Sequence, residues 1–331
     1  MKRLLLAAMM AVLGAAGPTA ANDSTVTVGA GGLVYTTSSK IRIERENLSI
    51  SEKEVTVAYD FFNESDEDIS TLVAFPLPDL EFDGDWNYVV RSADPVNWIG
   101  FTVMVDGHEV KPQVQARAMR FGIDVTEVLQ RYGIPVTMLS GPESLIAMDD
   151  RLSALPPEAK AELLRYGVVD WTSSWGANNV PLPTYHWTSQ ITFYWFQTFP
   201  AGKTLHVEHR YKPVPGYSFV TAEGIEEAYL QREFCIDKDL SKAIVSKLKT
   251  EQDEIMSGVN LRYVVVTAGN WLGPIGKFSM TIDKGIPETM LATCWKGLKQ
   301  TGQQTMGFDQ EYFQPEDDVN IILIKPFDRN E

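Results

Sequence analysis

The sequence predicts a mainly β protein: a β-sandwich with a helical insertion, followed by a C-terminal β-rich (α+β) part. Apolar and polar residues alternate along much of the segment 22–118, which is the period of half-buried strands. Between residues 119 and 168 the apolar residues recur every three or four positions, as in amphipathic helices. Clusters of Gly, Pro, Asn and Asp separate the apolar runs, as turns do between short strands.

The first strands follow one another closely. Two short strands are expected on either side of the Gly-rich turn Gly29–Gly32, and a longer alternating strand over Ile41–Ile50. The clearest alternation lies in Val55–Asp79, where two apolar runs flank the polar run Asn63–Asp68. Pro76 and Pro78 stop the second run. This pattern predicts an antiparallel pair joined by a polar turn, and Val89–Val110 predicts further strand.

The segment 119–168 predicts three helices on this β scaffold. Their expected ranges are Thr126–Tyr132, Pro142–Leu155 and Ala159–Tyr166, with Gly133 and Gly167 as stops. Leu145, Met148 and Leu152 lie on one face of the second helix. Such a face either caps an open sheet edge or docks a partner, and the sequence leaves both alternatives open.

The aromatic stretch Tyr185–Phe199 predicts a strand with one face in the core, and Leu205–Tyr211 predicts its hairpin partner. With the flanking loops expected over Trp171–Ala177 and Val214–Gly224, the region 169–224 would complete the sandwich. The region 225–331 predicts a β-rich part with one helix. Its expected elements are the helix within Ile236–Leu248 and the strands Leu261–Thr267, Lys277–Ile282, Met290–Trp295 and Val319–Ile324.

The first 21 residues have the organisation of a secretion signal peptide. Lys2 and Arg3 give a positive start, Leu4–Ala16 is apolar, and Thr19–Ala21 offers small residues for cleavage. The apolar run is shorter than the roughly 20 residues that span a bilayer. We therefore expect cleavage near Ala21, a mature chain that starts at Asn22, and a periplasmic or secreted location.

The composition excludes some partners. The net charge is −15, and loss of Lys2 and Arg3 would make it more negative, so binding to nucleic acid is not expected. No later stretch predicts a transmembrane segment. The two cysteines, Cys235 and Cys294, favour a disulfide in an oxidising compartment, with two separate buried thiols as the alternative.

The acidic run Asp79–Asp85 is the nearest approach to a metal site. Asp79, Glu81, Asp83 and Asp85 alternate ahead of a turn, as oxygen ligands do at the start of a calcium loop. Position twelve of that loop is Val90 where calcium loops carry Glu, so an acidic surface loop is the competing interpretation. No other cofactor is predicted.

Trp171 and Trp175 are the candidates for a ligand surface. Exposed indole rings can stack on sugars, although aromatic residues near strands more often lie in the core. No catalytic residue is predicted, because the sequence carries neither a Gly-x-Ser-x-Gly turn nor a His-Glu-x-x-His helix. Whether the chain is an enzyme stays open, and a non-enzymatic role is favoured.

Three segments carry a resemblance to a known family: Asn22–Thr25, Gly31–Val34, and Tyr59–Ser65 leading into Val73–Asp79. In these the chain resembles a family of secreted bacterial proteins with a domain of unknown function, number 4424. The strand, turn and "FPLP" arrangement is more loosely similar to VIT domains, which are extracellular β-sandwich modules. The resemblance implies an exported β protein and brings no catalytic residues.

These observations together predict a non-catalytic, exported interaction or scaffold protein whose partner is an envelope or extracellular protein. The partner would dock on Leu145, Met148 and Leu152. The alternative is a carbohydrate-binding or carbohydrate-active protein that uses Trp171, Trp175 and the acidic run.

Overall fold

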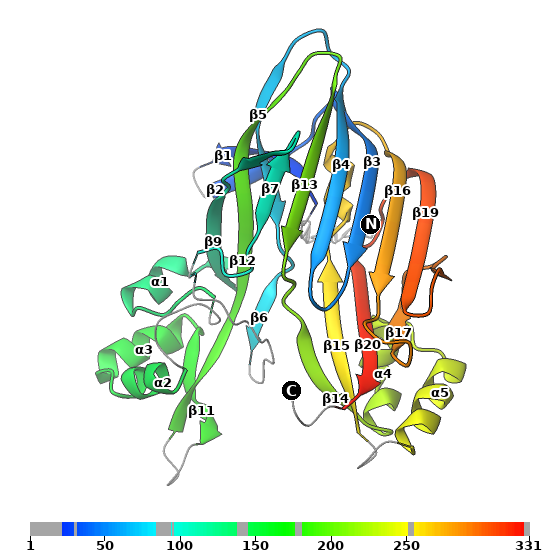
Figure 1. Ribbon diagram of the computed structural model, residues 1–331. Helices are drawn as coiled ribbons and strands as arrows, with labels where there is room; N and C mark the ends of the chain where they lie inside the picture. The colour runs from blue at the N-terminus through cyan, green and yellow to red at the C-terminus, as the bar shows by residue number, and fades with distance from the viewer. Residues whose placement is uncertain are drawn as a thin grey trace, which may run out of the picture.

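The computed structural model describes residues 22–29, 32–83, 94, 96–137, 145–175, 181–250 and 255–327, and of residues 83 and 173–175 only the backbone. The predicted signal peptide lies outside these residues. Within them the chain forms two eight-stranded sheets and one four-stranded sheet. Figure 1 shows the two large sheets side by side, with the third sheet below them and the helices at the periphery. The predicted mainly β class with a helical insertion is confirmed.

The first sheet is organised around one long strand, β12 (Pro181–Phe199), which contains the aromatic stretch. Buried residues alternate along it, because every second side chain faces the core. It pairs with β5, β6, β9 and β11 at successive positions. The other strands are β1 (Ser24–Gly29), β2 (Gly32–Thr36), β5 (Ile69–Pro76), β6 (Leu80–Asp83), β9 (Gln113–Arg120), β10 (Ile123–Asp124) and β11 (Val169–Trp175).

The second sheet has β4 at its centre, with strict alternation of buried residues as the sequence predicted. Its strands are β3 (Ile41–Ile50), β4 (Val55–Asn63), β7 (Thr102–Val105), β8 (His108–Val110), β13 (Thr204–Tyr211), β16 (Ile275–Asp283), β18 (Lys299–Gln300) and β19 (Thr305–Phe313). β16 lies parallel to β3. The C-terminal region therefore extends the sheet that the N-terminal region begins.

The third sheet consists of β14 (Gly216–Val220), β15 (Met256–Tyr263), β17 (Met290–Thr293) and β20 (Val319–Pro326). The 3₁₀ turn η2 (Gly224–Glu226) and the helices α4 (Ala228–Glu233) and α5 (Lys238–Leu248) lie beside it. Asp237 caps α5 by accepting hydrogen bonds from the amides of Asp239 and Leu240. Three of the four strands that the sequence predicted here overlap this sheet: β17, β20 and, over Leu261–Tyr263, β15. The predicted strand Leu261–Thr267 ends at Tyr263, and its last two residues belong to a second 3₁₀ turn, η4 (Val266–Asn270).

The helical insertion contains α1 (Thr126–Arg131), α2 (Leu145–Ser153) and α3 (Pro157–Arg165). Met148 and Leu152 of α2 are 3% and 0% exposed and belong to the main hydrophobic core, whereas Leu145 is 41% exposed. The apolar face of α2 therefore packs inward, as the capping alternative expects, and Met148 and Leu152 present no surface to a partner. The start of the predicted second helix, 142–144, lies outside the described residues.

Two predicted hairpins are wrong, because their strands lie in different sheets. β4 pairs with β3 and β13, while β5 pairs with β1 and β12. The turn after β12 likewise carries the chain across to β13. The two crossing loops bond to each other, since the amide of Gly202 donates to the carbonyls of Asn63 and Ser65, each at 3.1 Å. A short polar turn closes a hairpin or an arch equally well, so alternation alone does not distinguish them.

Several strands were not predicted as such, among them β6, β9, β10 and β18. β11 and β14 lie in segments that we expected to be loops, and β19 was not predicted. β11 pairs with the beginning of β12, and four consecutive residues of β19 are exposed. In each case the partner strand stabilises a segment whose own apolar period is weak.

Candidate functional site

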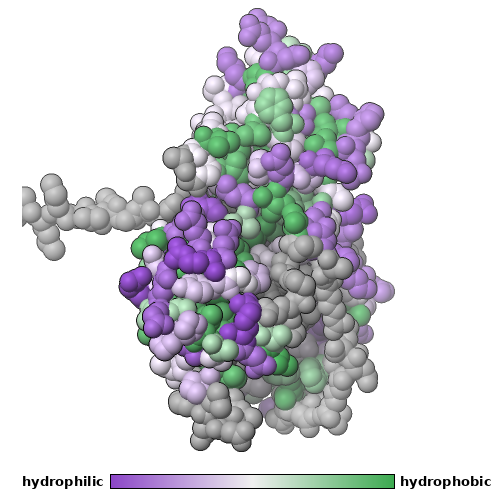
Figure 2. Space-filling model, turned by 90° about the vertical axis from the view of Figure 1, so that its left-hand side faces the viewer, coloured by the Kyte–Doolittle hydropathy of each residue, from purple (hydrophilic) through white to green (hydrophobic). Residues whose placement is uncertain are grey.

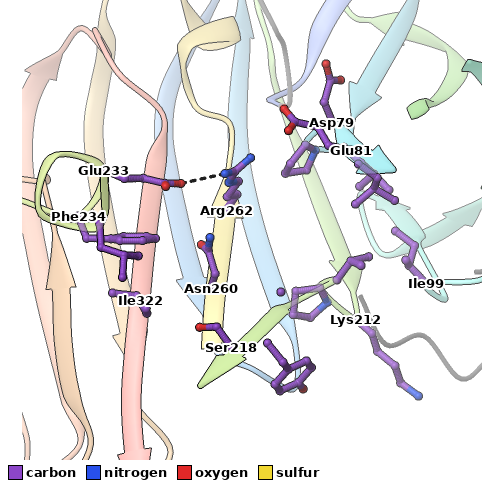
Figure 3. Close-up of a pocket in the computed structure, with 18 of the residues that line it drawn as sticks. Asp79, Glu81, Ile99, Lys212, Ser218, Glu233, Phe234, Asn260, Arg262 and Ile322 are labelled. Atoms are coloured by element: carbon purple, nitrogen blue, oxygen red, sulfur yellow. Dashed lines mark hydrogen bonds and ion pairs between the residues drawn. The ribbon is translucent and has the colours of Figure 1, made fainter. Parts of the chain in front are cut away.

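A cleft opens where the first sheet, the second sheet and the third sheet meet. It encloses about 330 Å³. One wall is the segment Leu77–Glu81, which links β5 to β6; a second is the link from β13 to β14 around Lys212. The third wall consists of β15, β20 and α4 (Figure 3). With Ile99, six separate stretches of the sequence contribute to one concave surface, as is typical of ligand sites.

Charged side chains face one another across this cleft. The Arg262 guanidinium on β15 lies 2.9 Å from a carboxylate oxygen of Glu233 at the end of α4. Asp79 and Glu81 enter from the opposite wall (Figure 3). The side-chain amide of Gln190 donates to Asp79 at 3.2 Å. Three carboxylates and one guanidinium thus share this lining.

Burial raises the pKa of Asp79 above its ordinary value. The hydrogen bond from Gln190 and the charge of Arg262 oppose this rise, and the charge of Glu81 adds to it. The pKa of Asp79 is therefore influenced by charged groups of both walls.

Two residues of the cleft lining each carry a buried polar atom that has no hydrogen-bond partner among the described residues. These atoms are the hydroxyl of Tyr211 at the end of β13 and the side-chain oxygen of Asn260 on β15. A buried polar group without a partner costs about 1–3 kcal/mol, so native proteins rarely keep one without a bound water or ligand. Burial also raises the pKa of Tyr211, so its hydroxyl stays protonated at neutral pH.

Aromatic rings form the apolar part of the cleft. Tyr217 of β14 contributes to the lining. So do Tyr229 of α4 and Phe234, which follows α4 directly. The hydroxyl of Tyr217 donates to Glu52 at 3.2 Å, which holds this ring in place. Tyr229 is 52% exposed at the rim. The cleft therefore combines ring faces with planar polar side chains.

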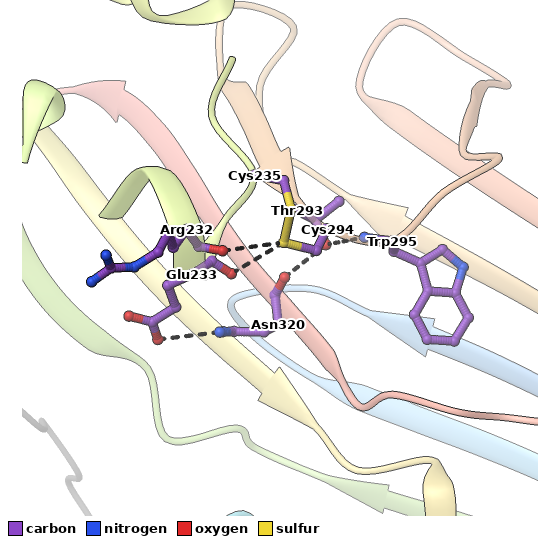
Figure 4. The surroundings of a disulfide bond; sticks show 7 residues. All are labelled: Arg232, Glu233, Cys235, Thr293, Cys294, Trp295 and Asn320. Carbon is purple, nitrogen blue, oxygen red and sulfur yellow. Dashed lines mark hydrogen bonds between the residues drawn. A yellow bond between two sulfur atoms is a disulfide. The ribbon is translucent and has the colours of Figure 1, made fainter. Parts of the chain in front are cut away.

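A disulfide between Cys235 and Cys294 anchors the wall formed by α4 (Figure 4). The expected pairing is thus present, with a Cα–Cα distance of 4.9 Å. Cys235 follows Glu233 and Phe234, and Cys294 follows β17. Asn320 of β20 donates to Glu233 at 3.2 Å. The disulfide and this hydrogen bond together fix the carboxylate that holds Arg262.

The structure places only some of the metal ligands proposed from the sequence in the cleft. Asp79 and Glu81 line the cleft, while the side chain of Asp83 and all of Asp85 lie outside the described residues. Within the described part of the chain no cluster of three or more His, Cys, Asp or Glu is arranged to hold a metal ion. The calcium site stays a prediction that the structure does not assemble from described residues.

The tryptophans lie elsewhere. Trp171 is half-buried on β11, with the Lys160 ammonium 5.3 Å from its ring centroid, and it is not part of the cleft. The side chain of Trp175 lies outside the described residues. Sequence reasoning missed Arg262, Glu233, Asn260 and Tyr211, because they come from separate strands and one helix. The acidic residues at 79 and 81 were the part of the cleft that the sequence pattern indicated.

Comparisons with known proteins give the family and little beyond it. No curated protein matches the chain. One solved structure, described as a "putative nutrient binding protein" from Legionella pneumophila, is similar with a TM-score of 0.43 at 13% identity. That match covers 87% of this chain and 68% of the other. No helix among the described residues has the length and apolar character needed to cross a membrane. The model of the family named Domain of unknown function (DUF4424) matches residues 21–322, and the chain therefore belongs to that family.

Proposed function

We propose that this protein is an exported, non-catalytic binding protein whose cleft holds a small, hydroxyl-rich ligand such as a sugar. The observation that carries the proposal is the lining of the cleft, in which Arg262, Asp79 and Glu233 lie on the same concave surface as the ring of Tyr217. Planar polar side chains beside an aromatic ring suit a ligand that brings hydroxyl groups.

The chemistry of the lining supports a hydroxyl-rich ligand. A hydroxyl group donates and accepts, so it can pair with a carboxylate of the lining or with the Arg262 guanidinium. The rings of Tyr217 and Tyr229 offer apolar faces to the C–H faces of a sugar ring. The volume of about 330 Å³ is at the small end of the range for ligand pockets, which suits one or two sugar units.

The charges of the cleft argue against an anionic ligand. Asp79, Glu81 and Glu233 outnumber Arg262 and Lys212 in the lining, and Arg262 is already paired with Glu233. The whole chain is acidic as well, with a net charge of −15. Phosphates and carboxylates would be repelled, so a neutral or cationic ligand is favoured.

Export is supported by the charged start, apolar run and small residues of the first 21 positions. A periplasmic or secreted location gives a sugar-binding protein direct access to external solutes. Intact mass of the protein recovered from the cell envelope tests this location, and a species that keeps Met1 would contradict it.

The decisive experiment is calorimetric titration of the mature protein with a panel of mono- and disaccharides, polyols, amino acids and phosphosugars. We expect binding of a neutral polyol or sugar, with the ligand recovered chemically unchanged. Arg262→Gln should weaken binding at least tenfold. Arg131→Gln is the matched control, because Arg131 also pairs with a glutamate, Glu162, but on the helical insertion.

Two results would contradict this function. One is the absence of binding across the panel at millimolar concentration. The other is binding that Arg262→Gln leaves unchanged. Chemical conversion of a bound sugar would instead assign catalysis to the cleft carboxylates.

Protein docking at the helical insertion is a second candidate, favoured by exposed apolar residues there. Phe121, Ile123 and Leu164 are 79%, 61% and 56% exposed. Figure 2 shows this side of the molecule, where hydrophobic residues are dispersed among hydrophilic ones. Crosslinking in the native envelope tests the candidate: a defined partner that is lost with Phe121→Ser supports it, and an unchanged crosslinking pattern contradicts it.

A further inference from the structure

The first described residues, Asn22 and Asp23, are completely buried. The backbone nitrogen of Asn22 donates to the Thr267 hydroxyl at 2.5 Å, and that hydroxyl in turn donates to the Asn22 carbonyl at 2.9 Å. The indole nitrogen of Trp271 donates to the Asp23 carbonyl at 2.5 Å. Thr267 lies in the 3₁₀ turn η4, and Trp271 follows that turn directly. The start of the described chain is therefore fixed against the C-terminal region.

Two carboxylates are buried with these residues. Asp23 is paired with His209, whose Nε2 lies 2.9 Å from it. Glu46 of β3 is 0% exposed and accepts hydrogen bonds from the side-chain amide of Asn22 at 3.1 and 3.2 Å. In the part of the chain that the structure describes, no basic side chain pairs with Glu46. A buried carboxylate without a cation is costly unless it is protonated or a counter-ion is supplied.

We infer that cleavage of the bond before Asn22 supplies that counter-ion: the α-ammonium group of the mature chain stays in this buried position and neutralises Glu46. The inference rests on the placement of Asn22, whose backbone nitrogen and side-chain amide lie in the same buried cluster as the Glu46 carboxylate. It does not depend on the ligand of the cleft.

The electrostatics of the uncleaved chain are consistent with a missing positive charge. Burial raises the pKa of Glu46 to about 8. The hydrogen bond from Asn22 lowers this pKa, and the charge of Asp23 raises it further. A peptide nitrogen at Asn22 is neutral, whereas a free α-amino group carries a positive charge at and below its ordinary pKa of about 7.7–8.0. Cleavage therefore adds one positive charge beside a carboxylate that lacks one.

The other titratable groups that face this cluster come from three strands. Tyr59 of β4 donates to the Asn22 side-chain oxygen, and Tyr263 of β15 lies 3.1 Å from the Tyr59 hydroxyl. Burial raises the pKa of both tyrosines, so they are neutral throughout the range of the test. His209 of β13 pairs with Asp23. None of these groups supplies the charge that Glu46 needs.

Accessibility of the α-amino group gives the first test. Intact mass of the exported protein should show a chain that starts at Asn22. An amine-reactive succinimidyl ester at pH 8 should label the α-amino group of the unfolded protein and label the native protein at least tenfold more slowly. A different first residue, or equal labelling rates in the two states, would overturn the inference.

Stability of matched chains gives the second test. A chain that starts at Asn22 is compared with a chain that keeps Ala21, each with Glu46 and with Glu46→Gln. At pH 8 we expect the extra residue to lower the folding equilibrium constant at least tenfold when Glu46 is present. In the Glu46→Gln background the effect should be much smaller. Equal effects in the two backgrounds, or none, would show that the α-ammonium does not act on Glu46.

A third measurement decides the question if Glu46→Gln does not fold. Urea unfolding of the Glu46 chain is followed from pH 6 to pH 9 with a free and with an acetylated Asn22. The free chain should keep its folding equilibrium constant to a higher pH than the acetylated chain. Superimposable pH profiles would refute the proposed pair.

Discussion

The imidazole Nε2 of His209 lies 2.9 Å from a carboxylate oxygen of Asp23, and the two side chains are 0% and 1% exposed. The rings of Phe75, Phe101 and Trp195 surround this imidazole at centroid distances of 5.2 Å. The pair connects β13 to the first residues of the described chain. It thus joins the middle of the sequence to its start through an interaction that water does not screen.

We expect His209→Leu to destabilise the protein by about 3–5 kcal/mol, because it leaves the Asp23 carboxylate buried without a partner. Urea unfolding measures the loss. His206→Leu is the control, since His206 lies on the same strand but its side chain is 45% exposed, and its loss should cost less than about 1 kcal/mol. A cost for His209→Leu no larger than that of the control would contradict the structural role of the pair.

The pKa of Glu46 predicts a pH dependence for a chain in which Asn22 follows another residue. Its folded-state pKa of about 8 exceeds the ordinary value of 4.5, so the folded state binds one more proton between these values. Stability is then full below about pH 4.5 and falls as the pH rises through 8, by up to about 5 kcal/mol in total. Glu46→Gln should flatten this profile. A profile that stays level from pH 5 to 9 for this extended chain with Glu46 would disprove the shift.

Loss of the disulfide should affect both stability and the cleft. The bond closes a loop with a sequence separation of 59 residues, and in the chain-entropy model its removal costs about 4 kcal/mol. We expect the Cys235→Ser, Cys294→Ser double variant to melt at a lower temperature in calorimetry. Because α4 then loses its anchor next to Glu233, any ligand of the cleft should bind more weakly. The control is the wild-type protein under non-reducing conditions, and unchanged melting would exclude a structural role for the bond.

Phe121 occupies a turn position that is unfavourable for its side chain. Its φ is 50° and that of Gly122 is 76°, so both residues of the turn between β9 and β10 are left-handed. This conformation costs an ordinary L-residue about 1–2 kcal/mol, and Asn tolerates it better. We expect Phe121→Asn to raise the free energy of unfolding by about 1 kcal/mol. A destabilised variant would show that the exposed ring, with the Arg120 guanidinium 4.2 Å from its centroid, contributes more than the turn costs.

Alternation in the sequence predicted which residues face the core more reliably than which strands pair. Along β4 every second residue is buried, from Val55 to Asn63, as the pattern indicated. The neighbour of a strand depends on loops and on distant segments, so the arch after Asn63 was mistaken for a hairpin. Local sequence patterns do not predict the parallel pairing of β3 with β16, because it joins segments over two hundred residues apart.

The cleft was predictable only in part for the same reason. Asp79 and Glu81 are recognisable in the sequence as carboxylates that follow Pro76 and Pro78, where the strand ends, and both line the cleft. Arg262 and Asn260 look like ordinary solvent-facing residues of a strand until β14 and α4 are placed beside them. The buried state of Asn22 was likewise invisible, although the sequence pattern did indicate that a mature chain would start there.

The bonds between Asn22 and Thr267 have a consequence for the folding reaction. The two residues are separated by 245 positions, and β3 needs β16 as its neighbour. A chain that emerges N-terminus first cannot complete its core before the C-terminal quarter is available. Such non-local topologies fold slowly, in milliseconds to seconds or longer. Until then the edge of β3 that pairs with β16 is open, so the emerging polypeptide is expected to depend on chaperones that shield strand edges from aggregation.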